Sequence, residues 1–314
     1  MVESKHKWKA WLYLSPAIVL LLIFTVWPII NTLHLSVQEN YNQMGSQGGN
    51  TFEYGFGNFA NVIKYKGFLT CLKNTLLLCV LTVPISTFLA LLIAVCLNAI
   101  KPLQRLLQTI FFLPYVTNSI AIGMVFAAMF NMVGSAFGGE NELIVTAGIV
   151  NNVIEFFGGT AINWINSGSS YWANIWVMVI YIVWNALPFK ILILLGGLQS
   201  VNKQYYDAAK VDGTGRVRVF TRITVPLLSP MLAYVIITGF IGGFKEYSSI
   251  VGIFGEGMGP AGDKDRLNTM VGFIYDAIET SKYGRASAAA LILFAIIFVV
   301  TMINLYVSKK KTHY

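Results

Sequence analysis

Residues 197–230 read GLQSVNKQYYDAAKVDGTGRVRVFTRITVPLLSP and separate two strongly apolar segments of the chain. The helix-forming residues of Asn202–Lys210 predict a short helix, and the sequence DGTG at 212–215 predicts a turn after it. A second short helix is expected over Arg216–Ile223, because its basic residues lie on one side and its apolar residues on the other. Pro226 marks the entry to the next apolar segment. The stretch is therefore expected to be a basic helix–turn–helix at a membrane surface.

The composition of the whole chain identifies the apolar segments as membrane spans. Of 314 residues, 56% are hydrophobic and 11% are charged, whereas about 25% are charged in soluble domains. So few charges do not cover the surface of a soluble protein of this length. An ordinary cytosolic enzyme, a secreted disulfide scaffold and a disordered regulator are thereby excluded. The net charge of +8 is attributed to cytoplasmic loops and not to nucleic-acid binding.

Six apolar segments are long enough to cross a bilayer, which takes about 20 residues of helix. They are residues 11–35, 74–97, 106–132, 172–198, 227–251 and 286–307. The expected fold class is all-α, a polytopic membrane protein with six transmembrane helices. Residues 143–157 are apolar but too short to span, so an interfacial or re-entrant helix is expected there.

Basic residues mark the cytoplasmic side of membrane proteins and give the orientation. With the N-terminus inside, thirteen Lys and Arg side chains fall on the inside and seven on the outside. Residues 1–10 are therefore expected to be a cytoplasmic N-terminus and 308–314 a cytoplasmic C-terminus. Between them, residues 11–307 form the transmembrane domain, with the basic loop at about 200–226 in the cytoplasm and the polar stretch 40–58 outside.

The sequence has no motif for catalysis or for metal binding. No GxxxxGK[ST] loop for nucleotide phosphates occurs. The three histidines and three cysteines lack the spacing that a metal site or a nucleophilic triad requires. The chain is therefore not expected to be an enzyme, nor to bind a metal or a cofactor of its own.

The basic loop resembles the EAA loop of permease subunits in binding-protein-dependent ABC importers. The family pattern is E-A-A, three residues, G, nine residues and then I-x-L-P. In this chain the positions that match, at the same spacing throughout, are Asp207, Ala208, Ala209, Gly213, Ile223 and Pro226. The sequence departs from the pattern by Asp for Glu and by Val225 for Leu. A basic loop that merely rests on anionic headgroups does not account for paired alanines before a glycine turn.

The resemblance extends over essentially the whole chain, to the maltose-type branch that imports sugars. It is carried by WLYLSPAI at 11–18, WP at 27–28, FFLP at 111–114, GMGP at 257–260 and YGRASA at 283–288. The chain is similar to the first permease of the pair, without the extra N-terminal helices of the larger maltose permease.

The resemblance implies an ABC importer type I permease fold in the bacterial cell membrane. It also implies four kinds of partner: a second, homologous permease subunit, two ATPase subunits that bind the ATP, an extracytoplasmic solute-binding protein and the carbohydrate. The ATPase subunits would close on ATP and push on the EAA loops. Ala208 and Ala209 are expected to face a groove of the ATPase, Asp207 to accept a charge-assisted bond and Gly213 to occupy the turn.

Two spans offer the aromatic faces and planar polar groups that sugar sites combine. The expected substrate path consists of Tyr181, Trp184, Asn185 and Phe189 in the fourth span and Gly243, Lys245, Glu246 and Tyr247 in the fifth. By the family resemblance, both stretches are similar to substrate-contacting segments. Helix packing or an interfacial belt is the alternative for the aromatic residues, and an ion pair near the outer face is the alternative for Glu246.

The favoured function is import of a carbohydrate, with an oligosaccharide as the expected substrate. Glycerol-3-phosphate or its diesters are the alternative, because Lys190 and Lys245 lie in membrane segments and favour an anion. Snorkelling to an interface, or pairing of Lys245 with Glu246, would explain these lysines without a ligand. A secondary transporter is the alternative of a different class, although Glu246 is the one acidic residue in an expected span and no internal repeat is visible.

Overall fold

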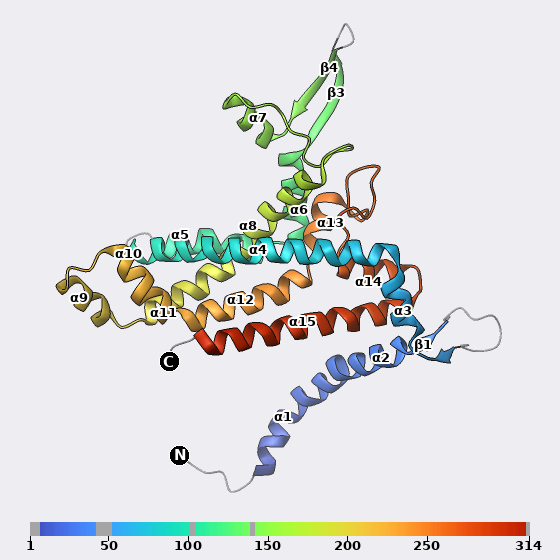
Figure 1. Ribbon diagram of the computed structural model, residues 1–314, viewed down its shortest axis with the longest axis horizontal. Coiled ribbons are helices and arrows are strands. Elements are labelled where there is room, and N and C mark those ends of the chain that lie inside the picture. The colour runs from blue at the N-terminus through green and yellow to red at the C-terminus, as the bar shows by residue number, and fades with distance from the viewer. Residues whose placement is uncertain (1–6, 42–51, 101–103, 139–141, 312–314) are drawn as a thin grey trace. The chain divides into compact units, whose positions relative to one another are not determined.

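The computed structural model describes residues 7–41, 52–100, 104–138 and 142–311, and these residues are mostly helical (Figure 1). The chain divides into two units. One unit contains the chain up to Phe68 together with Phe273–Ala295, and the other contains Leu69–Gly272 together with the chain from Ile296 onward. Parts of the expected cytoplasmic ends, residues 1–6 of 1–10 and 312–314 of 308–314, lie outside the described residues, as do residues 42–51 of the expected external loop.

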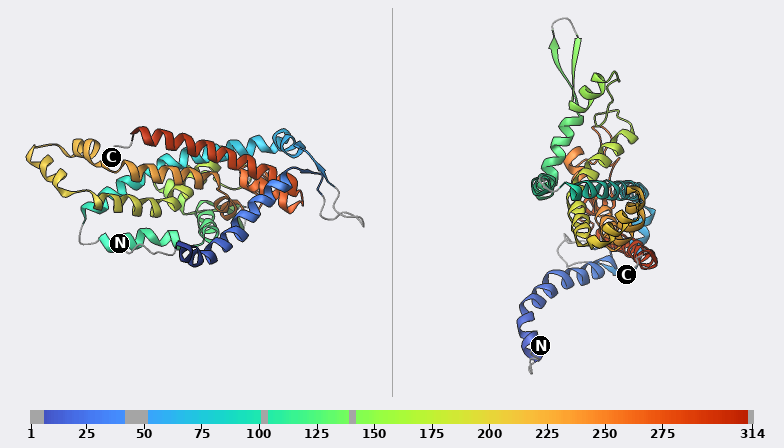
Figure 2. Two further views of the ribbon diagram at one scale, coloured as in Figure 1. Left: turned by 90° about the horizontal axis from the view of Figure 1, so that it is seen from below. Right: turned by 90° about the vertical axis from the view of Figure 1, so that its left-hand side faces the viewer.

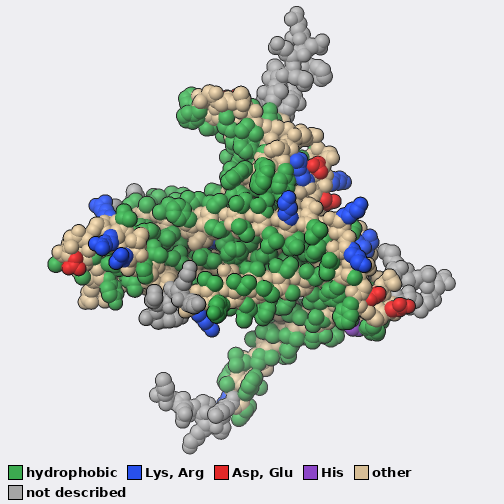
Figure 3. All heavy atoms as spheres, in the orientation of Figure 1, with side chains coloured by type: hydrophobic (Ala, Val, Ile, Leu, Met, Phe, Trp, Pro, Cys, Tyr) green, Lys and Arg blue, Asp and Glu red, His purple; other side chains and the backbone are tan. Residues whose placement is uncertain are grey.

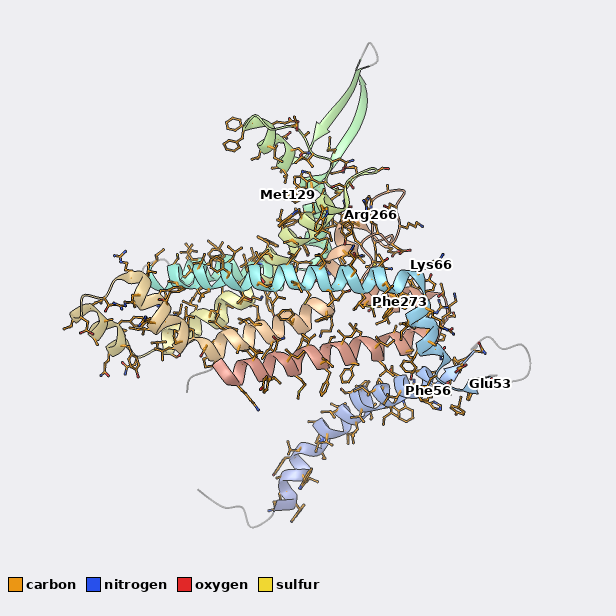
Figure 4. The ribbon with its side chains drawn as sticks, in the orientation of Figure 1. Glu53, Phe56, Lys66, Met129, Arg266 and Phe273 are labelled. Atoms are coloured by element: carbon orange, nitrogen blue, oxygen red, sulfur yellow. The ribbon has the colours of Figure 1, made fainter. Side chains whose placement is uncertain are left out.

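The first unit begins with a long apolar helix in three parts, α1 (Lys7–Leu21), the π-helical η1 (Leu22–Val26) and α2 (Trp27–Ser36). A short antiparallel pair follows, β1 (Gln38–Glu39) with β2 (Glu53–Tyr54), and then α3 (Gly57–Lys64). The ring of Phe273, labelled in Figure 4, lies 5.6 Å from that of Tyr65 and 6.3 Å from that of Phe68. These three rings pack the unit's first chain segment, near Phe68, against its second segment, which begins at Phe273.

The second unit contains most of the remaining helices and one longer hairpin, whereas the helical residues within Phe273–Ala295 belong to the first unit. The elements from its start to the end of the chain are α4 (Lys66–Ala99), α5 (Gln104–Phe112), η2 (Leu113–Val116), α6 (Ser119–Phe130), β3 (Met132–Gly138), β4 (Glu142–Ala147), α7 (Ile149–Phe156), α8 (Tyr171–Ser200), α9 (Lys203–Val211), α10 (Arg216–Val219), η3 (Phe220–Thr224), α11 (Val225–Leu227), α12 (Ser229–Phe244), α13 (Ser248–Phe254), α14 (Met270–Glu279) and α15 (Tyr283–Lys311). Within this unit, α9 and α10 project from one end of the long helices, and β3, β4 and α7 lie away from them beyond α6 (Figures 1 and 2).

The core of the second unit forms around α8, which contributes to two hydrophobic clusters. Tyr181 and Met178 are fully buried in the first cluster, with residues of α4, α6 and α13. Leu194 and Leu195 lie in the second, with residues of α4 and with Val235 of α12. The outer faces are also apolar, and Figure 3 shows hydrophobic side chains over most of the visible helix surface. An apolar core inside an apolar surface is typical of a protein whose solvent is lipid.

The described residues bear out a multi-pass membrane fold but correct its geometry. Four helices are long and apolar enough to cross a membrane, and the number rises to six if each of two bent helix pairs is one span. The four are Trp8–Ser36, Lys66–Ala99, Tyr171–Ser200 and Tyr283–Lys309. Each of them overlaps one of the expected spans.

The third expected span, 106–132, is not one helix. It consists of Leu106–Val116 and Ser119–Phe130, which meet at 98°. The chain is extended at Thr117, and Asn118 then caps α6 by accepting a hydrogen bond from the Ile120 amide at 2.8 Å. Asparagine at this position satisfies a free amide of the first turn and starts a new helix in a new direction.

The fifth expected span, 227–251, ends earlier than expected. Its helix, Ser229–Phe244, follows Arg216–Leu227 at a bend of 67° and stops at Phe244. The amide of Lys245 bonds to the carbonyl of Gly242, a tight turn that ends α12 before α13 begins at Ser248. The polar stretch KEYSS at 245–249 falls at this break, and apolar residues resume at Ile250, so the expected span ran across it.

The expected helix at 143–157 is also corrected, because the first half of the segment is a strand. β4 pairs antiparallel with β3, and only Ile149–Phe156 is helical, as α7. Asn151 of α7 is buried, and its side chain exchanges hydrogen bonds with the backbone of Ile162 at 3.0 and 3.1 Å. These bonds tie α7 to the loop that follows it.

Candidate functional site

A cavity of about 390 Å³ lies in the second unit, between α4, the η2–α6 bend, α8 and the end of α12. Six of the eight residues expected on the substrate path line it. They are Asn185, Phe189, Gly243, Lys245, Glu246 and Tyr247. The bend at Thr117 and the break after Phe244 both face this cavity, because Tyr115, Ser119 and Ser248 are also in its wall. The two interruptions of the spans therefore build the site.

Tyr181 supports the cavity from behind and does not line it. The tyrosine is fully buried, and its hydroxyl donates to the Ser119 carbonyl at 2.6 Å. The same hydroxyl accepts a hydrogen bond from the Asn185 side chain at 3.2 Å. Asn185 lies four residues later on α8, so Tyr181 fixes how this amide is presented to the cavity.

Trp184 does not belong to the cavity. Its ring packs at 5.3 Å from Phe126 of α6, and the residue is 36% exposed. The alternative of helix packing thus accounts for Trp184. Phe189 behaves as expected, since it lines the cavity and stacks on Tyr115 at 5.9 Å with 18° between the rings.

Lys190 is buried, and the idea that it snorkels to an interface is wrong. The residue is 4% exposed and lines the cavity. Its ammonium donates to Ser86 Oγ at 2.7 Å, Thr87 Oγ1 at 2.9 Å and the Val83 carbonyl at 3.3 Å. These bonds link α8 to α4 across the middle of both helices.

Glu246 and Lys245 line the cavity without pairing with each other. Neither ion pair found among the described residues involves them, so the pairing considered from the sequence is wrong. Glu246 instead accepts a hydrogen bond from the Ser249 amide at 3.3 Å, at the start of α13. Its backbone carbonyl accepts from Thr269 Oγ1 at 2.8 Å. The carboxylate is thus held at a helix start, where negative charge is stabilised.

Sequence reasoning missed the polar residues that α4 and η2–α6 contribute. Ser86, Tyr115 and Ser119 line the cavity and had not been assigned a role. The one available signal was Pro114, because a proline in an apolar helix often marks a bend that exposes backbone and side chains to a cavity.

The basic loop forms the expected helix–turn–helix. Asn202 caps α9 by accepting a hydrogen bond from the Gln204 amide at 3.0 Å. Gly213 has φ +65°, and the Thr214 amide bonds back to the Ala209 carbonyl at 2.9 Å. This left-handed glycine after a helix is the usual way to end it and reverse the chain. The Tyr206 and Thr224 hydroxyls, 3.4 Å apart, join α9 to η3.

The motif residues of this loop divide into an outward and an inward set. Asp207 and Ala208 are exposed, and Asp207 forms a surface ion pair with Lys210 at 3.5 Å. Ala209 is 5% exposed within its own chain, so the expectation that both alanines face a partner is wrong for Ala209. Its small side chain lets α9 lie close to the rest of the loop. Ile223 is half-buried in η3 and Pro226 lies in α11, at the base of the loop.

The loop also exposes large apolar side chains that sequence reasoning had not assigned. Val211 is 89% exposed, Val217 78% and Tyr205 54%. Tyr205 and Val211 lie before the turn, on either side of Ala208 in the sequence, and Val217 lies after the turn. The loop thus combines basic residues with exposed apolar side chains.

Comparison with known proteins relates this geometry to a transport family. The family model described as "binding-protein-dependent transport system inner membrane component" matches residues 83–313, which include the loop and all the cavity-lining residues except Thr82. The chain is 29% identical over 308 residues, 97% of this chain and 89% of the relative, to the arabinooligosaccharides transport system permease protein AraP of Halalkalibacterium halodurans. It is 26% identical over 314 residues, 100% of this chain and 99% of the relative, to the sn-glycerol-3-phosphate transport system permease protein UgpA of Agrobacterium fabrum.

A solved structure shows the same fold. A chain of a bacterial alginate ABC transporter, crystallised with a periplasmic protein that holds an alginate pentasaccharide, superposes with a TM-score of 0.79. The match covers 99% of this chain and 98% of that chain at 20% sequence identity. The chain therefore has the fold of an ABC importer permease.

Proposed function

The chain belongs to the family of binding-protein-dependent transport system inner membrane components, and we propose that it is one permease of an ATP-driven importer for a carbohydrate. An oligosaccharide is the proposed substrate. An extracytoplasmic binding protein delivers it, a second, homologous permease completes the pathway, and two ATPase subunits bind and hydrolyse the ATP. The observation that carries this proposal is the cavity. Relatives of this chain are named for different substrates, and the cavity of this chain has the side chains of a sugar-binding site.

The cavity has the chemistry that a pyranose ring requires. The stacked rings of Tyr115 and Phe189 offer an aromatic face for the C–H side of a sugar. The amide of Asn185 and the hydroxyl of Ser119 offer donors and acceptors for hydroxyl groups. A volume of about 390 Å³ lies within the range of small-ligand pockets, about 300–1,000 Å³.

The loop of α9 and α10 is proposed to dock on an ATPase subunit. Ala208, Tyr205, Val211 and Val217 supply an apolar surface, and Asp207 with Lys210 supplies charge at its edge. Small Ala208 permits close approach to a groove. Gly213 keeps the two helices of the loop at a fixed angle through its turn.

α12 connects the loop to the cavity, and this gives the importer a mechanical link. α12 starts at Ser229, directly after the loop, and its last residues Gly239, Gly242 and Gly243 form part of the cavity wall. At about 1.5 Å per residue, this helix carries a displacement over roughly 24 Å. Closure of the ATPase subunits on ATP would thus move the wall of the substrate cavity.

The proposed orientation puts this loop and both chain ends in the cytoplasm of a bacterium, with the permease in the inner membrane. The support is the excess of Lys and Arg on that side, since α9, α10 and η3 together contain Lys203, Lys210, Arg216, Arg218 and Arg222. The hairpin of β3 and β4 and helix α7 would then lie outside, where a binding protein docks.

A second candidate substrate is glycerol-3-phosphate or one of its diesters. The supporting observation is that Lys190 and Lys245 both line the cavity. The relative UgpA, named for transport of that compound, matches over 314 residues.

Purification through a tag on this chain tests the assignment. The chain is expressed with a candidate second permease, candidate ATPase subunits and a candidate binding protein from the same genome. We expect the ATPase subunits and the second permease to co-purify, and the binding protein to bind arabinooligosaccharides in a ligand panel that includes glycerol-3-phosphate. A chain that purifies without an ATPase subunit would contradict its assignment as an importer permease. A binding protein that binds only glycerol-3-phosphate would show that the second candidate, and not a carbohydrate, is the substrate.

A further inference from the structure

Lys190 places an ammonium group inside the helices of the second unit without a counter-ion. Its three hydrogen bonds go to Ser86 Oγ, Thr87 Oγ1 and the Val83 carbonyl, and all three acceptors are uncharged groups of α4. Neither of the ion pairs found among the described residues involves Lys190. A buried charge that meets only neutral dipoles is solvated but not neutralised.

The ammonium is open to the cavity on the side of α12. Gly239 faces it, and a Cβ at that position would lie 3.2 Å from Nζ, in contact with the ammonium. The glycine therefore leaves the charge uncovered. The charged residues of the cavity wall are Lys190, Lys245 and Glu246, so the wall carries one excess positive charge.

An ionisable side chain in a membrane segment usually lies on a substrate or ion pathway, because its cost must be offset by function. The links to Ser86 and Thr87 alone do not require a charge, since a neutral donor makes such bonds at lower cost in burial. The excess charge next to an open cavity thus points to a ligand of the opposite sign.

We propose that the cavity binds a substrate that bears an anionic group, a carboxylate or a phosphate, and that Lys190 neutralises this group. The inference rests on the proposed function, because it takes the cavity to be the transport site. The bond from Nζ to the Val83 carbonyl is the longest of the three, at 3.3 Å, and is the one that an anionic oxygen replaces. Ser86 and Thr87 keep the ammonium in position during this exchange.

Uptake by proteoliposomes tests the proposal with three labelled probes. The reconstituted complex is supplied with its binding protein and with digalacturonate, glycerol-3-phosphate or neutral galactobiose. We expect one of the two anionic probes to be imported faster than galactobiose. Lys190→Met should lower import of that probe about tenfold or more, whereas Lys190→Arg should retain most of it.

Two further variants separate charge recognition from helix packing. Lys190→Gln keeps a donor toward Ser86 and Thr87 without the charge, so it should show the same selective loss if Lys190→Met fails to assemble. Lys282→Met removes an exposed lysine outside the cavity and should leave import of every probe unchanged. A merely structural lysine would lower import of all probes equally.

The outcomes distinguish this inference from the proposed function. Import of galactobiose alone, or import of an anion that Lys190→Met and Lys190→Gln do not affect, overturns the anionic site and leaves a carbohydrate importer standing. Import of glycerol-3-phosphate alone supports the anionic site and overturns the carbohydrate. Failure to import any of the three probes overturns the inference.

Discussion

At the scale of single residues, the sequence predicted which side chains form the site better than it predicted their tasks. Asn185, Phe189 and Glu246 all line the cavity, as their residue types indicated. Trp184 does not line the cavity, because it precedes Asn185 by one residue on α8 and packs on Phe126 instead. The partners of Lys190 lie more than a hundred residues away on α4, a pairing that no local pattern encodes.

Asn185→Ala should lower the rate of substrate uptake about three- to tenfold, the worth of about one hydrogen bond to the ligand. The helix itself should be unaffected, since alanine is a good helix former. Trp184→Phe is the matched control on the neighbouring position, outside the cavity, and should transport like the wild type. Equal uptake by Asn185→Ala and the control would show that the cavity is not the substrate site.

Gly213→Val should weaken co-purification of the ATPase subunits, because a β-branched residue at φ +65° costs roughly 1–2 kcal/mol and disturbs the turn between α9 and α10. Gly213→Asn tolerates this backbone conformation and should retain the ATPase. Gly196→Ala, at a helical glycine with open space around it, serves as the control. Unchanged binding of the ATPase by Gly213→Val would make the loop a surface feature only.

At the scale of elements, composition gave the number of apolar segments but not their breaks. Pro84 and Pro188 lie inside the continuous helices α4 and α8, whereas Pro114 lies at the bend between α5 and α6. A proline in an apolar segment is therefore compatible with a continuous helix or with a bend, and tertiary packing decides which of the two forms. The stop of α12 at Phe244 has no proline at all, and the glycines at 242 and 243 are common in straight membrane helices as well.

α6 and α13 cross at a contact between two glycines, which explains how the two short helices fit together. A Cβ on Gly123 would lie 2.7 Å from the Cα of Gly252. We expect Gly123→Val to destabilise the protein by about 1–3 kcal/mol, since backbone on the other side cannot move aside easily. Thermal unfolding in detergent should show a lower midpoint for Gly123→Val and an equal or higher one for Gly196→Ala, because alanine favours the helix. An unchanged midpoint for both would mean that the crossing is loose.

At the scale of the whole molecule, the charge distribution predicts the orientation of the chain in the membrane. In a Cys96→Ser background, which removes an exposed native thiol, Asn152→Cys on α7 should react with a membrane-impermeant thiol reagent in intact cells. Lys203→Cys on α9 should react only after the membrane is opened. Labelling of Lys203→Cys from outside would reverse the topology and remove the ATPase from the reach of the loop.

The central claim is that ATP hydrolysis by partner subunits, transmitted through α9, α10 and α12, drives a substrate through the cavity. Uptake of the binding protein's labelled ligand into proteoliposomes, with ATP enclosed, tests it most directly. The account predicts uptake that requires ATP, the ATPase subunits and the binding protein together, and that falls when Gly213→Val replaces the wild-type chain. Uptake driven by an ion gradient without the ATPase would contradict it and would identify the chain as a secondary transporter.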